Sequence, residues 1–280
     1  MSFLEEILAS TRQAVEERRR SRSLDDLVSS VRARPDDRRF LEALRKPGMS
    51  VIAEFKRNSP SQTEVDNSAN LREVVGEYER GGASAISVLT AEAKFHGSLE
   101  DLEAARSACH LPILRKDFIV DEYQIYEAAV REVDAVLLIA AAFDKDPLRL
   151  RALYDTARGL SLDVLIEVRS QPELDVALDI TDELVGINNR DLDTLKIQPT
   201  TTATLAAGLS RDTTVVSESG IKTPEDLKNL VGKVRLDAAL IGTALMQAGA
   251  AREDLCRNFS SVAKNDSAPG QPRSPAALAA

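Results

Sequence analysis

Short apolar stretches rich in Val, Ile and Leu recur along the chain after Gly48, and amphipathic segments of helical length separate them. This alternation is typical of repeated βαβ units built around a parallel sheet. The stretches are almost continuously apolar, as expected for strands that are covered on both faces. We count eight of them, at residues 51–55, 85–89, 112–114, 135–139, 164–166, 184–187, 214–216 and 238–241.

Eight strands with intervening helices predict an α/β protein with a single (β/α)8 TIM barrel, a fold that typically takes about 250 residues. An open doubly wound sheet is the alternative. Neither "GINNRD" nor "SESGIK" has the G-x-G-x-x-G pattern of the dinucleotide-binding form of that sheet. The barrel is therefore predicted to span residues 49–263.

The two ends of the chain have different patterns from the middle. Residues 1–48 are predicted to form a helical extension before the barrel. The apolar residues of its first helix, spaced close to the 3.6-residue helical period, are Phe3, Leu4, Ile7, Leu8 and Val15. Residues 264–280, "KNDSAPGQPRSPAALAA", combine Pro, Ser, Ala and Gly without an apolar face, which predicts a disordered tail.

Charge and hydropathy exclude two classes of partner. The net charge of -9 disfavours a nucleic-acid-binding surface. No apolar run approaches the roughly 20 residues that cross a bilayer, so no membrane partner is expected. The start "MSFLEEILAS" lacks the basic segment and apolar core of a signal peptide, which predicts a cytoplasmic protein.

The cysteines and histidines do not indicate a metal centre. Cys109 and Cys256 lie far apart in the sequence and form neither a disulfide framework nor a metal-binding spacing. The two histidines, His96 and His110, add too few ligands for a dedicated zinc site. We therefore expect buried core thiols and no metal.

Charged residues follow several of the predicted strands at the end where barrel active sites lie. Glu54 and Lys56 are two residues apart, so on a strand their side chains point to the same side. A salt bridge that only caps the core explains this pair alone equally well. Lys116 and Glu167 repeat the same placement on two other strands, which favours a converging cluster. Such a cluster keeps its lysines protonated while burial raises the pKa of one glutamate, an arrangement suited to acid–base chemistry near neutral pH.

The loops after the seventh and eighth predicted strands have the features of a phosphate site. Gly220 precedes a helix that is predicted to begin at "TPED", with Thr223 as N-cap and Pro224 in the first turn. Gly242 and Thr243 directly precede another helix. Backbone N–H groups at such glycines and helix starts bind phosphate, and this fold commonly places a phosphate here. A tight strand-to-helix turn is the alternative for each glycine.

Nine fragments resemble indole-3-glycerol-phosphate synthase, an enzyme of tryptophan biosynthesis, and the resemblance runs from about residue 3 to residue 259, including the N-terminal helices. In chain order they are "IAEFKRNSPS", "SVLT", "FHGSLEDL", "ILRKDFIVDEYQIYEA", "VLLIAA", "IEV", "GINNRDL", "VSESGI" and "LIGTALM". The resemblance implies closure of the indole ring: 1-(o-carboxyphenylamino)-1-deoxyribulose 5-phosphate gives indole-3-glycerol phosphate, carbon dioxide and water. It also implies a carboxy-lyase with a small phosphorylated substrate, without metal or organic cofactor, and a monomer with at most weak self-association.

The resemblance also implies roles for residues at the strand ends. Lys116 is the general acid at the ketone oxygen, and Glu167 is the base in the later proton removal. Lys56 either holds the substrate carboxylate or acts as the acid for dehydration. The implied catalytic set is Lys116, Glu167, Lys56, Glu54, Asn188 and Ser219. The implied substrate-binding residues are Ser59, Gly220, Gly242 and Thr243 for the phosphate, Arg190 for orientation, and Phe95, Phe118, Leu137 and Leu192 for the aryl ring. For the aryl-ring residues, core packing is the alternative.

Two segments depart from the family pattern. The loop after the first strand usually reads SPSKG in bacterial members, whereas this chain has "SPSQTEV". The stretch that ends at Phe95 usually reads close to EKYF, and here it is "EAKF".

Two other functions compete with this interpretation. Phosphoribosylanthranilate isomerase is a related barrel, but it uses a Cys and an Asp, and no cysteine here ends a strand. A non-catalytic barrel that binds a phosphorylated metabolite, or that serves as a subunit of a tryptophan-pathway complex, is the alternative from another class.

Overall fold

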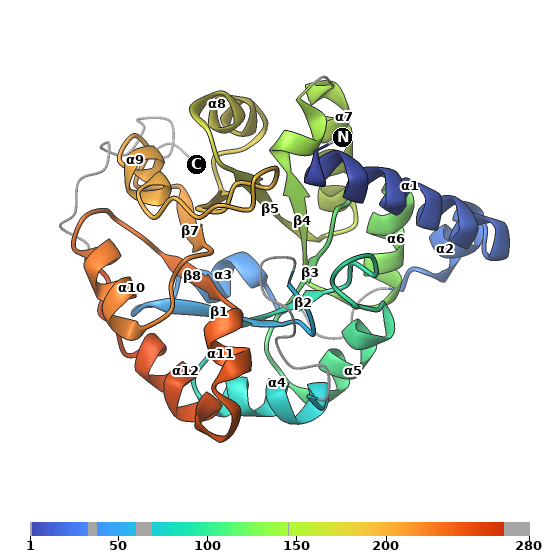
Figure 1. The fold of residues 1–280 in the computed structure, drawn as a ribbon. Coiled ribbons are helices and arrows are strands. Elements are labelled where there is room, and N and C mark those ends of the chain that lie inside the picture. The colour runs from blue at the N-terminus through green and yellow to red at the C-terminus, as the bar shows by residue number, and fades with distance from the viewer. Residues whose placement is uncertain (1, 33–37, 60–68, 145, 266–280) are drawn as a thin grey trace.

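Eight parallel strands close into a barrel in the computed structural model, in the order β1 to β8 (Figure 1). The structure describes residues 2–32, 38–59, 69–144 and 146–265. The strands are β1 Ser50–Phe55, β2 Ala85–Leu89, β3 Ile113–Lys116, β4 Ala135–Ile139, β5 Asp163–Val168, β6 Leu184–Asn188, β7 Thr214–Glu218 and β8 Ala238–Ile241. The predicted (β/α)8 fold is confirmed.

Helices surround the barrel and also precede it. The helices before β1 are α1 Phe3–Ser21, α2 Leu24–Ser30 and α3 Phe40–Leu44. The helices between and after the strands are α4 Leu71–Arg80, α5 Glu100–Ala108, α6 Glu122–Val130, α7 Pro147–Gly159, α8 Gln171–Ile180, α9 Thr201–Ala206, α10 Pro224–Val231, α11 Thr243–Gln247 and α12 Arg252–Ser260, with short 3₁₀ turns η1 Ala140–Phe143 and η2 Gly249–Ala251. None of the described helices is both long and apolar enough to cross a lipid bilayer.

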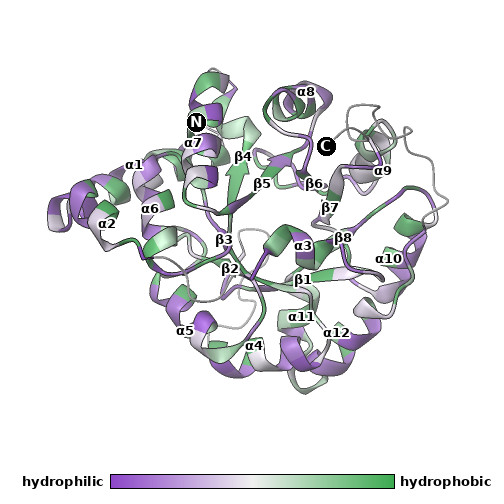
Figure 2. Cartoon of the chain, turned by 180° about the vertical axis from the view of Figure 1, so that it is seen from behind, coloured by the Kyte–Doolittle hydropathy of each residue, from purple (hydrophilic) through white to green (hydrophobic). Residues whose placement is uncertain are grey.

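Two apolar layers hold the barrel together. The outer layer packs one face of the strands against the surrounding helices, and it includes Phe55, Ile166 and both buried cysteines. The inner layer fills the barrel, where α3 contributes Phe40 and Leu44. In Figure 2 the surrounding helices carry both hydrophilic and hydrophobic residues, whereas β4 is green along its length. This distribution is the one expected when a parallel sheet is covered on both faces.

The inner faces of the strands change from apolar to polar near their C-terminal ends. Leu114, Leu165 and Val216 belong to the inner apolar layer. Because side chains alternate between the two faces of a strand, the residues two positions later also point inward. These residues are Lys116, Glu167 and Glu218, and each lies in the last two positions of its strand. These charged side chains therefore lie at the C-terminal end of the barrel, next to its apolar interior.

Helix α1 packs across the side of the barrel near α6 and α7 (Figure 1). Its Leu4, Ile7 and Leu8 belong to an apolar cluster that also contains Phe118 and Val120 from the segment after β3. The side chain of Ser2 caps its first turn, and Glu5 completes a capping box. The N-terminal helix therefore contacts the segment that follows β3. Residues 266–280 of the predicted tail and the "QTEV" loop at residues 62–65 lie outside the described residues.

Candidate active site

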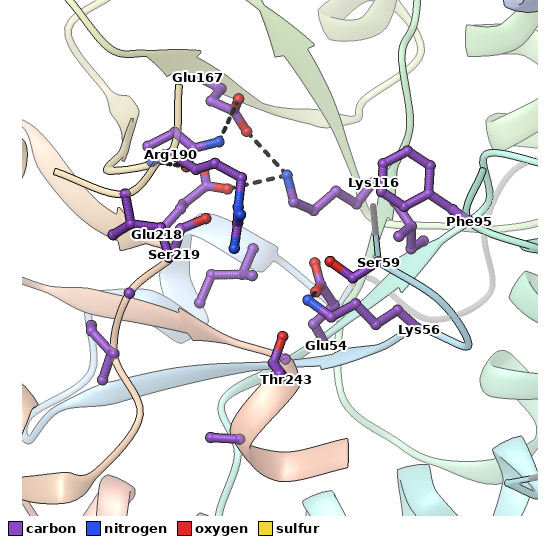
Figure 3. Close-up of a pocket in the computed structure, with 18 of the residues that line it drawn as sticks. Glu54, Lys56, Ser59, Phe95, Lys116, Glu167, Arg190, Glu218, Ser219 and Thr243 are labelled. Carbon is purple, nitrogen blue, oxygen red and sulfur yellow. Dashed lines mark hydrogen bonds and ion pairs between the residues drawn. The ribbon is translucent and has the colours of Figure 1, made fainter. Parts of the chain in front are cut away.

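A cavity of about 740 Å³ opens at the C-terminal ends of the strands. Every residue that the sequence assigns to the site lines this cavity. Residues more than 180 positions apart, such as Glu54 and Thr243, share its wall because the closed barrel gathers the ends of all strands at one mouth. Charged side chains occupy its floor, and Phe95 lies beside them (Figure 3).

Lys116 lies at the centre of a buried charge cluster (Figure 3). Its Nζ is 3.0 Å from Glu167 Oε2 and 3.2 Å from Glu218 Oε2. Asn188 donates a hydrogen bond of 2.9 Å from Nδ2 to Glu167 Oε1. Neither oxygen of Glu218 has a hydrogen-bond partner of good geometry among the described residues. Glu167 is thus held on both oxygens, whereas Glu218 lies beside the Lys116 ammonium without a well-formed hydrogen bond to the described residues.

The three charged groups shift one another's pKa values. Burial favours neutral Lys116, but the carboxylates of Glu167, Glu218 and Glu54 outweigh it and raise the pKa of the lysine. Burial also opposes ionisation of Glu167, yet the Lys116 charge and the Asn188 hydrogen bond hold the pKa of that carboxyl below its ordinary value. Burial, reinforced by the neighbouring Glu167, raises the pKa of Glu218 to about 8 despite the attraction of Lys116. Near pH 7 the cluster is therefore neutral overall.

The raised pKa of Glu218 gives a measurable dependence of stability on pH. The unfolded-state carboxyl titrates near its ordinary value, so wild-type stability is lost as pH rises from there through about 8. Glu218→Gln keeps the shape of the neutral form and does not titrate. We expect the melting temperature of Glu218→Gln minus that of wild type to grow between pH 5 and pH 8. Thermal denaturation followed by circular dichroism measures the difference, and a difference that stays constant over this range contradicts the shift.

A second charged pair lies on the β1 side of the cavity. Lys56 Nζ is 2.7 Å from Glu54 Oε1, and Glu54 is buried. A Cβ at Gly242 would lie 2.2 Å from Glu54 Oε1 and 2.9 Å from Lys56 Nζ. The backbone φ of Gly242 is -116°, which other residues adopt freely. This glycine is therefore required for space beside the ion pair.

Gly242→Ala is expected to displace the Glu54–Lys56 pair without unfolding the barrel. The clashing atoms are the ends of flexible side chains, which can move at little cost. We expect turnover to fall roughly tenfold, because misplacing groups in a site by about an ångström has effects of this order or larger. Gly159→Ala is the matched control, since a Cβ there meets nothing within 4 Å. Steady-state kinetics and thermal melts of both variants test this, and equal kcat/KM in the two variants contradicts it.

An apolar wall faces the charges. The rings of Phe95 and Phe118 pack with their centroids 5.9 Å apart. Leu137 is buried at the base of the wall, whereas Leu192 is half-buried at the rim. Arg190 donates a hydrogen bond of 3.0 Å to the carbonyl of Leu195. The cavity thus has an apolar side beside a charged floor.

The loops after β7 and β8 form the remaining wall. Ser219 and Gly220 both have positive φ, 63° and 88°. A Cβ at Gly220 would also lie 2.9 Å from Ile197. Thr223 caps α10, with its side chain accepting from the backbone N–H of Asp226, as predicted. Gly220 lines the cavity at this left-handed turn, where the sequence analysis places the phosphate.

Glu218 is the main residue to which the sequence analysis assigned no role. Its position was apparent, because it follows Val216 by two residues and therefore shares the inner face. Its contact with Lys116 was not, because β7 and β3 lie on opposite sides of the barrel order. Gly186 on β6 gives it space, since a Cβ there would lie 2.3 Å from Glu218 Oε1. The other unassigned lining residues include Leu240 and Lys222.

The sequence model of the family described as indole-3-glycerol phosphate synthase matches residues 4–257. The indole-3-glycerol phosphate synthase of a Nocardioides species is 44% identical over 89% of this chain and 95% of its own length. The chain belongs to the indole-3-glycerol phosphate synthase family. The Streptomyces coelicolor protein named indole-3-glycerol phosphate synthase 2 is 42% identical over 87% of this chain and 93% of its own length.

Distant solved structures share the fold of this synthase-family chain. The tryptophan synthase alpha chain of Legionella pneumophila has a TM-score of 0.54 at 15% identity, covering 80% of this chain and 95% of its own. The thiamine phosphate pyrophosphorylase of Pyrococcus furiosus has a TM-score of 0.55 at 16% identity, covering 76% and 94%. Structural similarity at identities this low establishes the barrel architecture alone, so function must be argued from the site.

One of the two departures from the synthase family pattern lies within the described residues. In "EAKF", Lys94 has a positive φ of 66°, and its Nζ lies 2.9 Å from Glu6 Oε1 on α1. Asn58 donates a hydrogen bond of 2.9 Å to the Lys94 carbonyl. The altered segment therefore joins the loop after β1 to the N-terminal helix.

In the described part of the chain, no three His, Cys, Asp or Glu side chains are grouped to hold a metal ion.

Proposed function

We propose that this protein closes the indole ring in tryptophan biosynthesis, converting 1-(o-carboxyphenylamino)-1-deoxyribulose 5-phosphate to indole-3-glycerol phosphate, carbon dioxide and water. The observation that carries the proposal is the placement of protonated Lys116 between two buried glutamates, opposite an aromatic wall, in a chain of this family. The substrate has an aryl ring, a carboxylate, a ketone and a phosphate. The cavity has a complementary group for each of them.

Lys116 is the acid of the first step in this proposal. The ring carbon that bears the carboxylate attacks the ketone carbon, and Lys116 donates a proton to the ketone oxygen as the new carbon–carbon bond forms. The carboxyl groups around it raise the pKa of the Lys116 ammonium, so it stays protonated across the neutral range. Loss of carbon dioxide then returns its bonding electrons to the ring. A positioned acid of this kind typically accelerates a step by about 10²- to 10⁴-fold.

Glu167 is the base of the later step. The hydroxyl leaves as water, and removal of a proton completes the indole ring. A base must be ionised to act, and the lowered pKa of Glu167 keeps it so at neutral pH. Asn188 fixes the carboxylate through its other oxygen. Glu218 is neutral near pH 7, so it adds no second negative charge beside the base.

Lys56 has two alternative roles within this proposal. Its ion pair with Glu54 places the ammonium at the cavity wall near Thr243, as Figure 3 shows. From there it either holds the substrate carboxylate or protonates the departing hydroxyl. Glu54 orients the ammonium in both cases, because its Oε1 lies 2.7 Å from Lys56 Nζ.

The proposed binding residues divide by the part of the substrate that they contact. Phe95, Phe118, Leu137 and Leu192 take the aryl ring, because an apolar concave wall suits a planar ring. Arg190 helps to orient the substrate. Ser59, Gly220, Gly242 and Thr243 take the phosphate. We extend the proposal to a monomer that acts in the cytoplasm on this small phosphorylated substrate.

A fluorescence assay with the carboxyphenylamino substrate tests the function. The protein contains no Trp, so new indole emission reports the product against a low background. We expect emission to grow with time and to saturate with substrate concentration. Absence of indole emission with folded protein contradicts the proposal, and tight binding of the substrate without turnover then favours a non-catalytic barrel.

A further inference from the structure

Strand β3 has charged residues on both of its faces at its C-terminal end. Leu114 and Lys116 face the barrel interior, so Arg115 between them faces outward. The Arg115 side chain is 0% exposed, and it donates a hydrogen bond of 2.6 Å from Nη1 to the carbonyl of Gln124 on α6. A fully buried arginine directly behind the central lysine of the site requires a compensating charge.

Two carboxylates and a second arginine complete a buried network. Arg115 Nη2 lies 2.8 Å from Asp117 Oδ2, and its Nη1 lies 3.4 Å from Glu127 Oε2. Arg18 on α1 donates a hydrogen bond of 2.7 Å from Nε to Glu127 Oε1. The four side chains carry no net charge together. Apolar residues of similar volume often stabilise a fold as well as buried ion pairs of this kind do. Stability alone therefore does not explain this network, and a positional role does.

Asp117 helps to hold the backbone at the C-terminal end of β3, next to Lys116. Its Oδ1 accepts a hydrogen bond of 2.8 Å from the backbone N–H of Phe118. Its Oδ2 accepts one of 2.8 Å from Thr90 Oγ1, while the backbone N–H of Thr90 donates to the carbonyl of Lys116 at 3.0 Å. The end of β3 therefore has little freedom to shift relative to β2.

We propose that Asp117 and Arg115 form a positioning pair that holds the Lys116 ammonium between Glu167 and Glu218, with Arg18 linking the pair to α1 through Glu127. The inference rests on the proposed function of Lys116 as the acid. A lysine side chain is long and flexible, so an anchored backbone is needed to keep its Nζ within contact of both carboxylates. Asp117 and Arg115 act through Lys116 and do not themselves react.

The chain offers a matched control at the other end of β3, in Asp134, which directly precedes β4. Asp134 is buried and forms an ion pair with Arg106, and its Oδ2 accepts a hydrogen bond of 2.8 Å from the backbone N–H of Ile113. Asp117 holds the C-terminal end of β3, and Asp134 holds the N-terminal end. The two aspartates therefore share burial, an arginine partner and a backbone contact, and they differ in distance from Lys116.

The test compares Asp117→Asn with Asp134→Asn in the indole-emission assay. We expect both variants to melt at lower temperature. Only Asp117→Asn should lower kcat, by about 10- to 100-fold, because small misplacements of reacting groups have effects of this size. The acid limb of its pH–kcat profile should also shift to higher pH, because a displaced Lys116 no longer lowers the pKa of Glu167. A merely structural role would leave this acid limb in place.

Thr90→Val keeps the test decisive if Asp117→Asn does not fold. This variant removes one hydrogen bond to Asp117 with little change in volume. We expect about a fivefold fall in kcat, with the acid limb shifted in the same direction. Unchanged kcat and an unshifted acid limb in each of these variants that folds, relative to Asp134→Asn, overturn the positioning role. Inactivity of wild type would instead overturn the proposed function, and the inference with it.

Discussion

Lys116→Met is expected to lower kcat by about 10²- to 10⁴-fold, the range that a positioned general acid contributes. Methionine keeps an unbranched apolar stem of similar length, so the barrel should stay folded. The removed charge is the one that lies between Glu167 and Glu218. Without it, two buried carboxyls face each other, and the pKa of Glu167 should rise from its lowered value.

Steady-state kinetics and circular dichroism together measure this effect. Lys228→Met is the control, because Lys228 lies on α10 with an exposed side chain, 3.7 Å from Glu225. We expect the control to retain wild-type turnover. A folded Lys116→Met protein with kcat near that of wild type would exclude Lys116 as the acid.

Glu167→Gln should also reduce turnover by about 10²- to 10⁴-fold, since it removes the proposed base and leaves an amide of the same shape. We expect the wild-type rate to fall on the acid side as pH drops through the lowered pKa of Glu167, because protonation removes the base. The variant has no carboxyl at this position, so its residual activity should lack that limb.

A pH series of kcat for wild type and Glu167→Gln provides the measurement. Glu225→Gln, an exposed substitution on α10, is the control and should reproduce the wild-type profile. An acid limb that persists unchanged in Glu167→Gln assigns the ionisation to another group. Comparison with Glu218→Gln then distinguishes the two glutamates. Burial raises the pKa of Glu218, whereas Lys116 and Asn188 lower the pKa of Glu167.

The contrast between these glutamates shows what a sequence pattern leaves open. The pattern predicted that burial would raise the pKa of one glutamate in the cluster. Glu54, Glu167 and Glu218 all end predicted strands, and each is nearly fully buried. The partners of each oxygen distinguish them: Glu167 has Lys116 and Asn188, whereas Glu218 lacks a well-formed hydrogen bond among the described residues. Such partners come from other strands, so adjacent sequence does not reveal them.

The N-terminal helix is a second example. Its apolar period predicted the helix, and the capping residues at Ser2 and Glu5 agree with the start of α1. The run "EERRRSRS" at residues 16–23 has the charge pattern of a solvated helix face. In the folded chain, Arg18 from this run contacts Glu127 and Arg19 contacts Asp121, both on the segment after β3. Which arginines become partly buried and paired depends on how α1 packs against α6.

The alternation of apolar runs and helical segments by itself determined the eight strands, their order and the barrel. Local periodicity is enough for this, because each strand must bury both faces and each crossover must return to the same sheet. The same pattern placed the assigned residues at one mouth, since parallel strands share their C-terminal edge. Only the tertiary structure decided which charges pair across the barrel, that Gly242 is required for space, and that Arg115 lies buried behind Lys116. These features depend on distances between atoms of different strands, and those distances are set by barrel closure.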